Sequence, residues 1–239
     1  MCNYPYPLEK LEKAIGYTFK NKSIITVALT HSSYANEQKM HSHKKKAECN
    51  ERLEFLGDSV LSFITSRFIY EKFADQPEGF LTKTRAAVVC SKSLANLANK
   101  IGLGNYLLLG KGEEDTGRTN PKILENAFEA LLAAIYLDSS YSIDTVAKFL
   151  MPIIEPEIHD ASKNSISFDY KTALQQFVQS VGKDRLQYIC VGESGPDHNK
   201  TFEVEAKLNS NIVGRGIGKT KREAEQNAAK EALELFAVK

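Results

Sequence analysis

Residues 50–61 read NERLEFLGDSVL, and the spacing of their apolar residues predicts a helix that is hydrophobic around most of its circumference. At about 100° per residue, Glu51, Glu54 and Asp58 fall on one narrow arc of this helix. A solvent-exposed face is the commonest explanation of acids at this spacing, but here Phe55 lies directly beside the arc. Carboxylates crowded on an apolar helix repel one another and lose solvation, so they require a counter-charge. A divalent cation bound by carboxylate oxygens would supply that charge.

Residues 122–138, KILENAFEALLAAIYLD, predict a second helix that is almost entirely apolar. Its interior polar positions, apart from a tyrosine, are Glu125, Asn126 and Glu129. Asn126 and Glu129 are three residues apart and therefore lie on one side of the helix. Carboxylate metal sites in helical proteins are built from such helices packed with their oxygen ligands facing each other. The two stretches together predict a metal site, although their spacing does not specify the reaction.

The hydrophobic periodicity changes about two thirds of the way along the chain. Helical spacing dominates up to Pro152 and Pro156, which we expect to close an all-helical part. Residues 159–167, HDASKNSIS, are polar and aperiodic, as a tether is. We therefore place a first domain at residues 1–157, a linker at 158–167 and a second domain at 168–239.

The second domain has the pattern of a small α+β fold. Two helical stretches enclose three strand-like stretches, and in the middle strand the apolar residues alternate cleanly with polar ones. The expected order is therefore α-β-β-β-α. The helices are predicted at 170–182 and 220–236, and the strands at 185–193, 201–208 and 211–218.

Composition restricts the classes of function. The chain has 31 Lys+Arg against 30 Asp+Glu, a net charge of +1, so any contact with nucleic acid must be local. Its four cysteines form no C-x-x-C pair, which is typical of reduced thiols in the cytosol. The longest apolar run, ALLAAIYL at 130–137, is far shorter than the roughly 18 residues of a membrane span. We expect a cytoplasmic protein that does not enter a membrane.

The start of the last predicted helix is unusually basic. Thr220 and Glu223 have the spacing of a capping box. Lys219, Lys221 and Arg222 crowd the same end, where cations oppose the helix dipole unless an anion lies nearby. Phosphates of a nucleic-acid backbone would be such an anion. The alternative is an incidental basic surface.

Several of these stretches together resemble the signature of the ribonuclease III family. The second domain resembles a double-stranded-RNA-binding domain, so the resemblance covers nearly the whole chain. In the first domain it rests on 28–37 (ALTHSSYANE), 50–61, 78–89 (EGFLTKTRAAVV) and 122–138; in the second it rests on 171–179 (KTALQQFVQ), 195–204 (GPDHNKTFEV) and 218–233 (GKTKREAEQNAAKEAL).

The resemblance implies an all-α endonuclease domain followed by a small α-β-β-β-α domain that binds double-stranded RNA. It further implies a homodimeric, Mg²⁺-dependent endoribonuclease, with Mn²⁺ able to substitute and no small-molecule cofactor. Such an enzyme cuts both strands of duplex RNA and leaves a 5′ phosphate and a short 3′ overhang. Its substrates would include structured RNAs such as ribosomal RNA precursors.

The resemblance also assigns roles to the acidic residues. Glu54, Asp58 and Glu129 match the family's metal-binding acids, and Asp58 and Glu129 match its catalytic residues. Glu51 and Glu78 match acids of the outer part of the same cleft. These roles are chemically reasonable, because a bound divalent cation activates water near neutral pH and stabilises charge on a phosphodiester. No catalytic histidine is then needed.

Other matching positions concern partners. Phe55 matches an aromatic residue that enters a pocket of the second subunit, the alternative being a core position within one subunit. Six further residues match the family's contacts to the minor groove and backbone of duplex RNA: Gln175, Gln176, His198, Lys219, Lys221 and Arg222. Such contacts recognise the A-form shape of the duplex more than its sequence.

The chain departs from the family at Asn126, where the family usually has Asp. An amide oxygen can still bind Mg²⁺, but it brings no negative charge. The chain is therefore either an enzyme with an altered metal site, which we favour, or a protein that binds duplex RNA without cutting it.

Overall fold

The computed structural model describes residues 6–41, 48–165, 170–182, 185–196 and 200–236. It divides into two compact units, Met1–Ile166 and Ser167–Lys239.

The first unit is built from helices, as predicted. Within the described ranges its only β-type pairing is one isolated bridge between Thr30 and Leu108. The helices are α1 (Leu8–Ile15), α2 (Lys22–Ala28), α3 (Ser32–His41), α4 (Glu51–Lys72), α5 (Glu78–Val88), α6 (Ser91–Lys100), α7 (Pro121–Asp138) and α8 (Ile143–Ser165), with short 3₁₀ turns at Leu103–Tyr106 and Gly117–Thr119.

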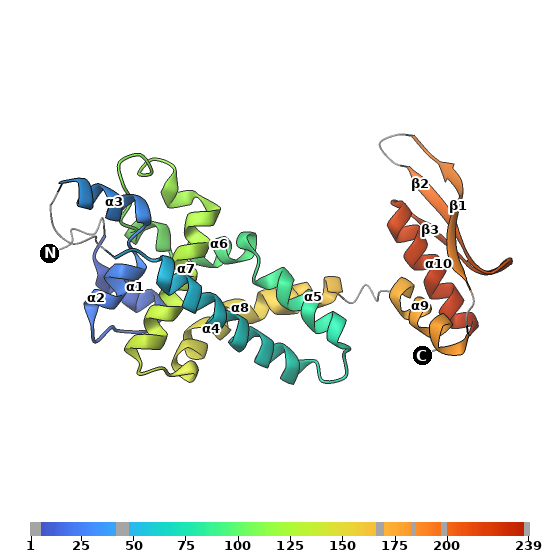
Figure 1. Ribbon diagram of the computed structural model, residues 1–239, viewed down its shortest axis with the longest axis horizontal. Helices are drawn as coiled ribbons and strands as arrows, with labels where there is room; N and C mark the ends of the chain where they lie inside the picture. The colour runs from blue at the N-terminus through green and yellow to red at the C-terminus, as the bar shows by residue number, and fades with distance from the viewer. Residues whose placement is uncertain (1–5, 42–47, 166–169, 183–184, 197–199, 237–239) are drawn as a thin grey trace. The chain divides into compact units, whose positions relative to one another are not determined.

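Helix α7 runs through the middle of this unit, and α4 crosses it (Figure 1). Its start is well defined, because Asn120 caps it and Pro121 fits the first helical position. Most of its residues are buried, including Phe128 and Leu131, which are 0% exposed. An almost entirely apolar helix is stable only when other helices cover it on all sides, and this explains its central place.

Helices α4 and α7 touch backbone to backbone at Gly57. A Cβ atom at this position would lie only 1.8 Å from the carbonyl oxygen of Glu129, so no larger residue fits without moving a helix. Glu54 and Asp58 lie on either side of Gly57 in the sequence. The close crossing therefore brings the acids of α4 to the level of Glu129 on α7.

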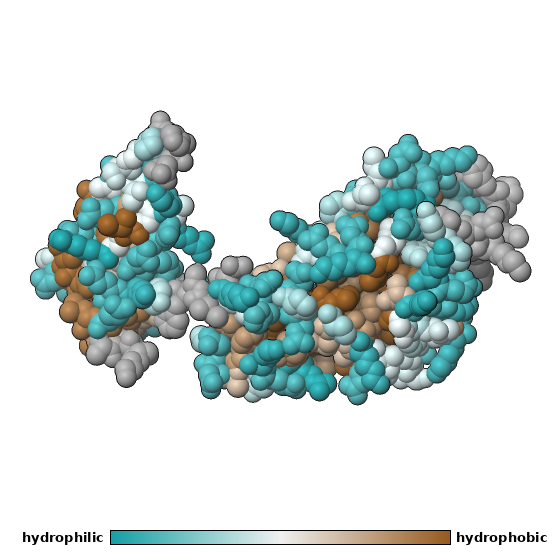
Figure 2. All heavy atoms as spheres, turned by 180° about the vertical axis from the view of Figure 1, so that it is seen from behind, coloured by the Kyte–Doolittle hydropathy of each residue, from teal (hydrophilic) through white to brown (hydrophobic). Residues whose placement is uncertain are grey.

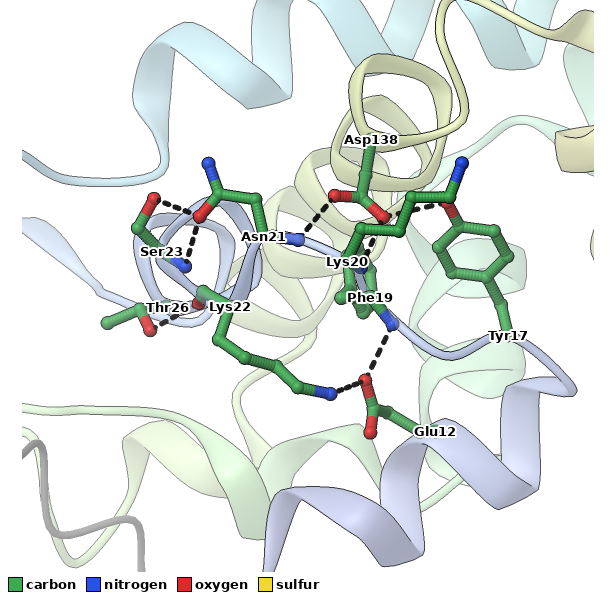
Figure 3. Close-up of polar contacts among 9 residues, drawn as sticks. All are labelled: Glu12, Tyr17, Phe19, Lys20, Asn21, Lys22, Ser23, Thr26 and Asp138. Carbon is green, nitrogen blue, oxygen red and sulfur yellow. Dashed lines mark hydrogen bonds and ion pairs between the residues drawn. The ribbon is translucent and has the colours of Figure 1, made fainter.

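The carboxyl end of α7 is fixed by a polar network (Figure 3). The Asp138 carboxylate accepts hydrogen bonds from the Tyr17 hydroxyl and from the backbone N–H groups of Lys20 and Asn21, each at 2.8 Å. Burial raises the pKa of Asp138, but these three donors lower it more, and the net direction is downward. The connection between α1 and α2 is thereby anchored to α7.

A second buried acid holds the other side of the same connection. Glu12, which is 6% exposed, accepts a 2.7 Å hydrogen bond from the Phe19 backbone N–H. It also forms an ion pair with Lys22, as Figure 3 shows. The start of α2 is therefore held in place by both α1 and α7.

The prediction of a linker at residues 158–167 is wrong for most of that range, because helix α8 continues through Pro152 and Pro156 to Ser165. Both prolines lie on the exposed side of the helix, where water can satisfy the carbonyl groups that lose a backbone donor. Ile154 and Ile158 on the opposite side are buried in the core. Burial of this apolar face outweighs the helix-breaking tendency of two prolines, and the compact units divide at residue 166 instead.

The second unit confirms the predicted α-β-β-β-α order. Its three strands form an antiparallel sheet in the order β1-β2-β3, with Tyr188 opposite Ala206 and Ala206 opposite Gly214. The elements are α9 (Tyr170–Val181), β1 (Leu186–Ser194), β2 (Thr201–Leu208), β3 (Asn211–Gly218) and α10 (Lys221–Leu235).

Helix α10 packs directly on strand β3. A Cβ atom at Gly216 would lie 2.1 Å from the Ala224 carbonyl oxygen, so glycine in the strand and alanine in the helix permit the close approach. Ala228 and Ala232 extend the same buried face of α10. The start of α10 is thereby fixed against the sheet.

The surface of both units carries apolar patches among hydrophilic residues (Figure 2). None of the helices described is both long enough and apolar enough to span a membrane.

Candidate metal centre and RNA-binding face

Three acids from the two predicted stretches come together where α4 crosses α7. Glu129 is only 7% exposed. Burial raises the pKa of Glu129 to about 8, and the nearby charges of Asp58, Glu125 and Glu54 contribute to the increase. Glu54, Asp58 and Glu129 thus form one electrostatically coupled group, which we call the acid cluster.

Glu54 links this cluster to further charges. Burial raises the pKa of Glu54, the ammonium group of Lys122 opposes the increase, and Glu125 and Glu51 add to it. Glu51 therefore lies beside the cluster, as its position on the helix predicted. Its side chain is exposed to solvent.

The oxygen atoms of this region are suited to a hard divalent cation. The Asn126 side-chain oxygen is buried and accepts no hydrogen bond from the described part of the chain. Glu129 likewise has no hydrogen-bond or ion-pair partner among the described residues. Carboxylate and amide oxygens are the ligands that Mg²⁺ and Mn²⁺ prefer. The residues present therefore fit such an ion in chemical type.

The carboxylate oxygens of the acid cluster do not converge on a single position that an ion could occupy. In the portion of the chain that the structure describes, no three His, Cys, Asp or Glu side chains form a group ready to hold a metal ion. Like charges repel one another, which favours side chains that point apart. The two helices bring the oxygen-bearing residues close together. Their side chains would have to rotate for the oxygens to surround one ion.

Glu78 does not join the acid cluster within one copy of the chain. The Phe80 ring packs edge-on against Phe73, with centroids 5.2 Å apart, which places the start of α5 at the carboxyl end of α4. With a rise of about 1.5 Å per residue, Glu54 and Phe73 are about 28 Å apart along α4. Glu78 therefore lies away from the acid cluster of its own subunit, and its place in the outer part of the cleft stays a prediction.

Two residues near the cluster were given no role by sequence reasoning. Lys122 Nζ lies 3.0 Å from the Glu125 Oε2 atom. The close ion pair with Glu125 raises the pKa of Lys122, and the charges of Glu54 and Glu129 also contribute. The spacing of Lys122, Glu125 and Glu129, at three and four residues, is the signal that could have placed all three on one side of α7.

Phe55 is not a core residue of one subunit, because its side chain is 79% exposed. A large exposed phenyl ring is unfavourable in water and often marks an interface. A cavity of about 550 Å³ opens between α2 and the first turns of α4, next to Phe55 in the sequence. Its walls include Ser23, Ile24, Val27, Arg52, Leu53 and Leu56.

In the second unit, the predicted RNA contacts that are described are accessible. Gln175 and Gln176 are exposed on α9, and Lys219, Lys221 and Arg222 are exposed at the start of α10. The remaining predicted contact, His198, lies outside the described residues.

Thr220 caps α10 as predicted, whereas the return bond of the capping box goes to the residue before the cap, Lys219. The Glu223 backbone N–H donates to the Thr220 hydroxyl oxygen at 3.1 Å, and the Glu223 carboxylate accepts from the Lys219 N–H at 2.7 Å. The basic end of this helix also has an internal counter-charge, because Lys221 Nζ lies 3.1 Å from the carboxylate of Glu193. Phosphate would therefore compete with Glu193 for Lys221.

Comparison with known proteins agrees with both units. Residues 21–154 match the family described as Ribonuclease-III-like, and residues 170–235 match the double-stranded RNA binding motif. The chain is 45% identical over 229 residues to Ribonuclease 3 of Geobacillus thermodenitrificans, covering 95% of this chain and 90% of that protein. It is 46% identical over 232 residues to Ribonuclease 3 of Caldanaerobacter subterraneus subsp. tengcongensis, covering 97% and 99%.

A solved structure of the nuclease domain of ribonuclease III from Campylobacter jejuni is similar to the first unit. It has a TM-score of 0.56 and 39% sequence identity, and covers 63% of this chain and 98% of that chain. A helical domain with an acid cluster around the buried Glu129, joined to a double-stranded-RNA-binding domain, defines a two-domain nuclease that acts on double-stranded RNA. The chain belongs to the ribonuclease III family, whose members are endoribonucleases that act on double-stranded RNA.

Proposed function

We propose that this chain cleaves both strands of duplex RNA by hydrolysis that depends on Mg²⁺, with Mn²⁺ able to substitute, and leaves a 5′ phosphate and a short 3′ overhang. The observation that carries the proposal is Glu129. This carboxyl group is 7% exposed, faces the like charges of Asp58 and Glu54, and has no partner among the described residues. Burying a carboxyl group among other carboxylates destabilises the fold unless a bound cation compensates their charge.

The residues that would hold the ion are Glu54, Asp58, Asn126 and Glu129. When bound, Mg²⁺ supplies an acidified water as nucleophile and stabilises negative charge on the scissile phosphodiester. Asp58 and Glu129 fix the ion and orient the reacting groups, so we regard them as the catalytic residues. The close crossing at Gly57 keeps their helices at a constant separation, which a precisely placed site requires.

The main experiment measures cleavage of labelled duplex RNA across an Mg²⁺ titration, for the natural chain and for Asn126→Asp. Because Asn126 adds an oxygen but no charge, we expect Asn126→Asp to cleave faster at low Mg²⁺ and the natural chain to approach it at high Mg²⁺ or with Mn²⁺. If both proteins bind duplex RNA but are inert at every metal concentration, the chain is a binding protein without nuclease activity. Equal cleavage at all concentrations would contradict the role of Asn126.

Duplex RNA is proposed to contact Gln175 and Gln176 of α9 and the basic start of α10. The exposure of these residues supports this assignment. Replacing Lys219 and Lys221 by alanine should weaken binding to all duplex sequences alike and reduce its salt dependence, because phosphate contacts release counterions without reading sequence. Lys230→Ala, at the other end of α10, is the matched control, and a loss confined to one RNA sequence would contradict the proposal.

We also propose that the enzyme is a homodimer in which Phe55 of one subunit enters the 550 Å³ cavity of the other. The Campylobacter jejuni relative is described as having a region involved in dimer formation. A dimer would also allow Glu78 of one subunit to approach the acid cluster of its partner. Sedimentation should show dissociation for Phe55→Glu but not for Tyr70→Ala, a control that removes another exposed aromatic residue of α4. An unchanged Phe55→Glu dimer would exclude this contact.

The cellular role that fits this activity is the processing of structured RNA, such as ribosomal RNA precursors, in the cytoplasm. Comparing precursor RNA in cells with and without the protein would test it, and unchanged processing would contradict it.

A further inference from the structure

Glu125 lies one helical turn before Glu129 on α7. Residues four apart in a helix share a side, so the two side chains belong to the same region of the surface that faces α4. The Glu125 side chain is only 12% exposed. One of its carboxylate oxygens, Oε2, is among the buried side-chain atoms of the chain. A glutamate that merely faced solvent would not be buried to this extent.

The charge of Glu125 falls within the acid cluster. It acts on both Glu54 and Glu129, one on each of the two helices. Asn126, the next residue, contributes a buried oxygen without a donor but no charge. The cluster therefore contains four carboxylates and one amide when Glu125 is included.

Lys122 supplies the present counter-charge. Its ammonium nitrogen lies 3.0 Å from Glu125 Oε2, while the lysine side chain is 66% exposed. Because most of the lysine side chain already lies in solvent, it can move away from Glu125 once another cation takes over the charge. A divalent cation entering the cluster would therefore be able to replace Lys122.

We propose that Glu125 belongs to the metal-binding site of this chain and supplies the negative charge that Asn126 does not carry. Glu125 and Asn126 are adjacent on α7, and glutamate is one methylene longer than aspartate, which extends its reach toward the ion. Asn126 would then supply an oxygen and Glu125 a charge, so the two positions should permit an exchange of charge. This inference rests on the proposed metal-dependent function.

The test measures Mn²⁺ binding directly, by calorimetry with the full chain and without RNA. Glu125→Gln should weaken Mn²⁺ binding about tenfold or more, the size of effect expected when a group that supports a metal ligand is removed. The double variant Glu125→Gln with Asn126→Asp should bind Mn²⁺ nearly as tightly as the natural chain, because it restores the number of charges. Lys122→Met should bind Mn²⁺ more tightly.

Two controls separate this role from folding and from the general proposal. Glu155→Gln makes the same chemical change in an ion pair with Lys72 outside the cluster, and it should leave Mn²⁺ binding unchanged. The helical circular-dichroism signal in EDTA should be the same for all variants, which establishes that the first unit, where the substitutions lie, is folded. The thermal stabilisation by Mn²⁺ should shrink in Glu125→Gln and return in the double variant.

The possible failures are distinct. If Glu125→Gln binds Mn²⁺ normally while Glu129→Gln does not, the metal site stands and the role of Glu125 is overturned. If the double variant fails to recover binding, charge at position 126 cannot replace charge at 125, and the exchange is overturned. If Glu129→Gln also binds Mn²⁺ normally, the proposed metal site itself is wrong.

Discussion

Glu129 and Asp138 are two carboxylates on the same helix with almost the same burial, 7% and 8% exposed, yet their environments are opposite. Asp138 accepts three hydrogen bonds at 2.8 Å, and its pKa is lowered. Glu129 has no donor among the described residues, and burial and neighbouring acids raise its pKa to about 8. Burial alone therefore does not decide how a carboxylate behaves.

The difference separates structure from function along α7. The donors to Asp138 come from the connection between α1 and α2, so this acid joins distant parts of the fold. The neighbours of Glu129 are like charges, which destabilise the metal-free fold and are useful only if a cation binds there. The end of α7 carries an acid that stabilises the fold, and its middle carries an acid for which we propose a metal-binding role.

The largest expected effect is on catalysis. Glu129→Gln replaces a carboxyl group that can lose its proton when Mg²⁺ binds by a neutral amide of nearly the same volume, so Mg²⁺-dependent cleavage should fall by about 100-fold to 1000-fold. Cleavage of labelled duplex RNA, measured at constant RNA binding, would check this. Asp138→Asn at the other end of α7 should cleave at a normal rate once folded, and a comparable loss from that variant would remove the distinction between the two acids.

The next effect is on stability. Asp138→Ala leaves the Tyr17 hydroxyl and two backbone N–H groups without their acceptor, and should lower the free energy of unfolding by about 2–3 kcal/mol. Urea denaturation of the metal-free protein would measure it. Asp144→Ala, whose side chain is 84% exposed, is the control and should change stability little. A stability loss no larger than that of the control would contradict the structural role of Asp138.

The third effect is the dependence of stability on pH. The pKa of a glutamate in an unfolded chain is about 4.3. In the folded state the pKa of Glu129 is about 8. Between these two pKa values the folded state binds more protons than the unfolded state, so the chain without bound metal should lose stability as pH rises from about 5 to 8, by about 3–4 kcal/mol. Glu129→Gln should lack this loss.

Urea denaturation in EDTA at several pH values would measure this effect. Glu78→Gln, which changes an exposed acid, should keep the pH dependence of the natural chain. If Glu129→Gln and the natural chain respond identically to pH, Glu129 does not hold its proton as described.

The smallest effect concerns one donor of the Asp138 network. Tyr17→Phe removes one of its three hydrogen bonds and leaves the two backbone donors, so the expected loss is about 0.5–1.5 kcal/mol. Tyr70→Phe removes the hydroxyl of a tyrosine that is 72% exposed and should change nothing measurable. A Tyr17→Phe loss as large as that of Asp138→Ala would mean that the tyrosine, and not the backbone, anchors the connection.

The sequence by itself determined the main elements of this protein. Helical periodicity in the first part, clean alternation in the middle strand of the second and the capping box at Thr220 and Glu223 are local features, because each depends on neighbours within a few residues. The acids of residues 50–61 and 122–138 were also recognised locally, since a line of oxygen atoms on an apolar helix is visible without a structure.

Only the tertiary structure decided the rest. Pro152 and Pro156 favour a break locally, but burial of Ile154 and Ile158 in the core keeps α8 continuous. Whether an acid is paired or unpaired depends on groups distant in the sequence, as Asp138 and Tyr17 demonstrate. In the same way, the interaction of Glu125 with Glu54 on the neighbouring helix depends on the packing of α4 against α7, because electrostatic interactions act through space and not along the chain.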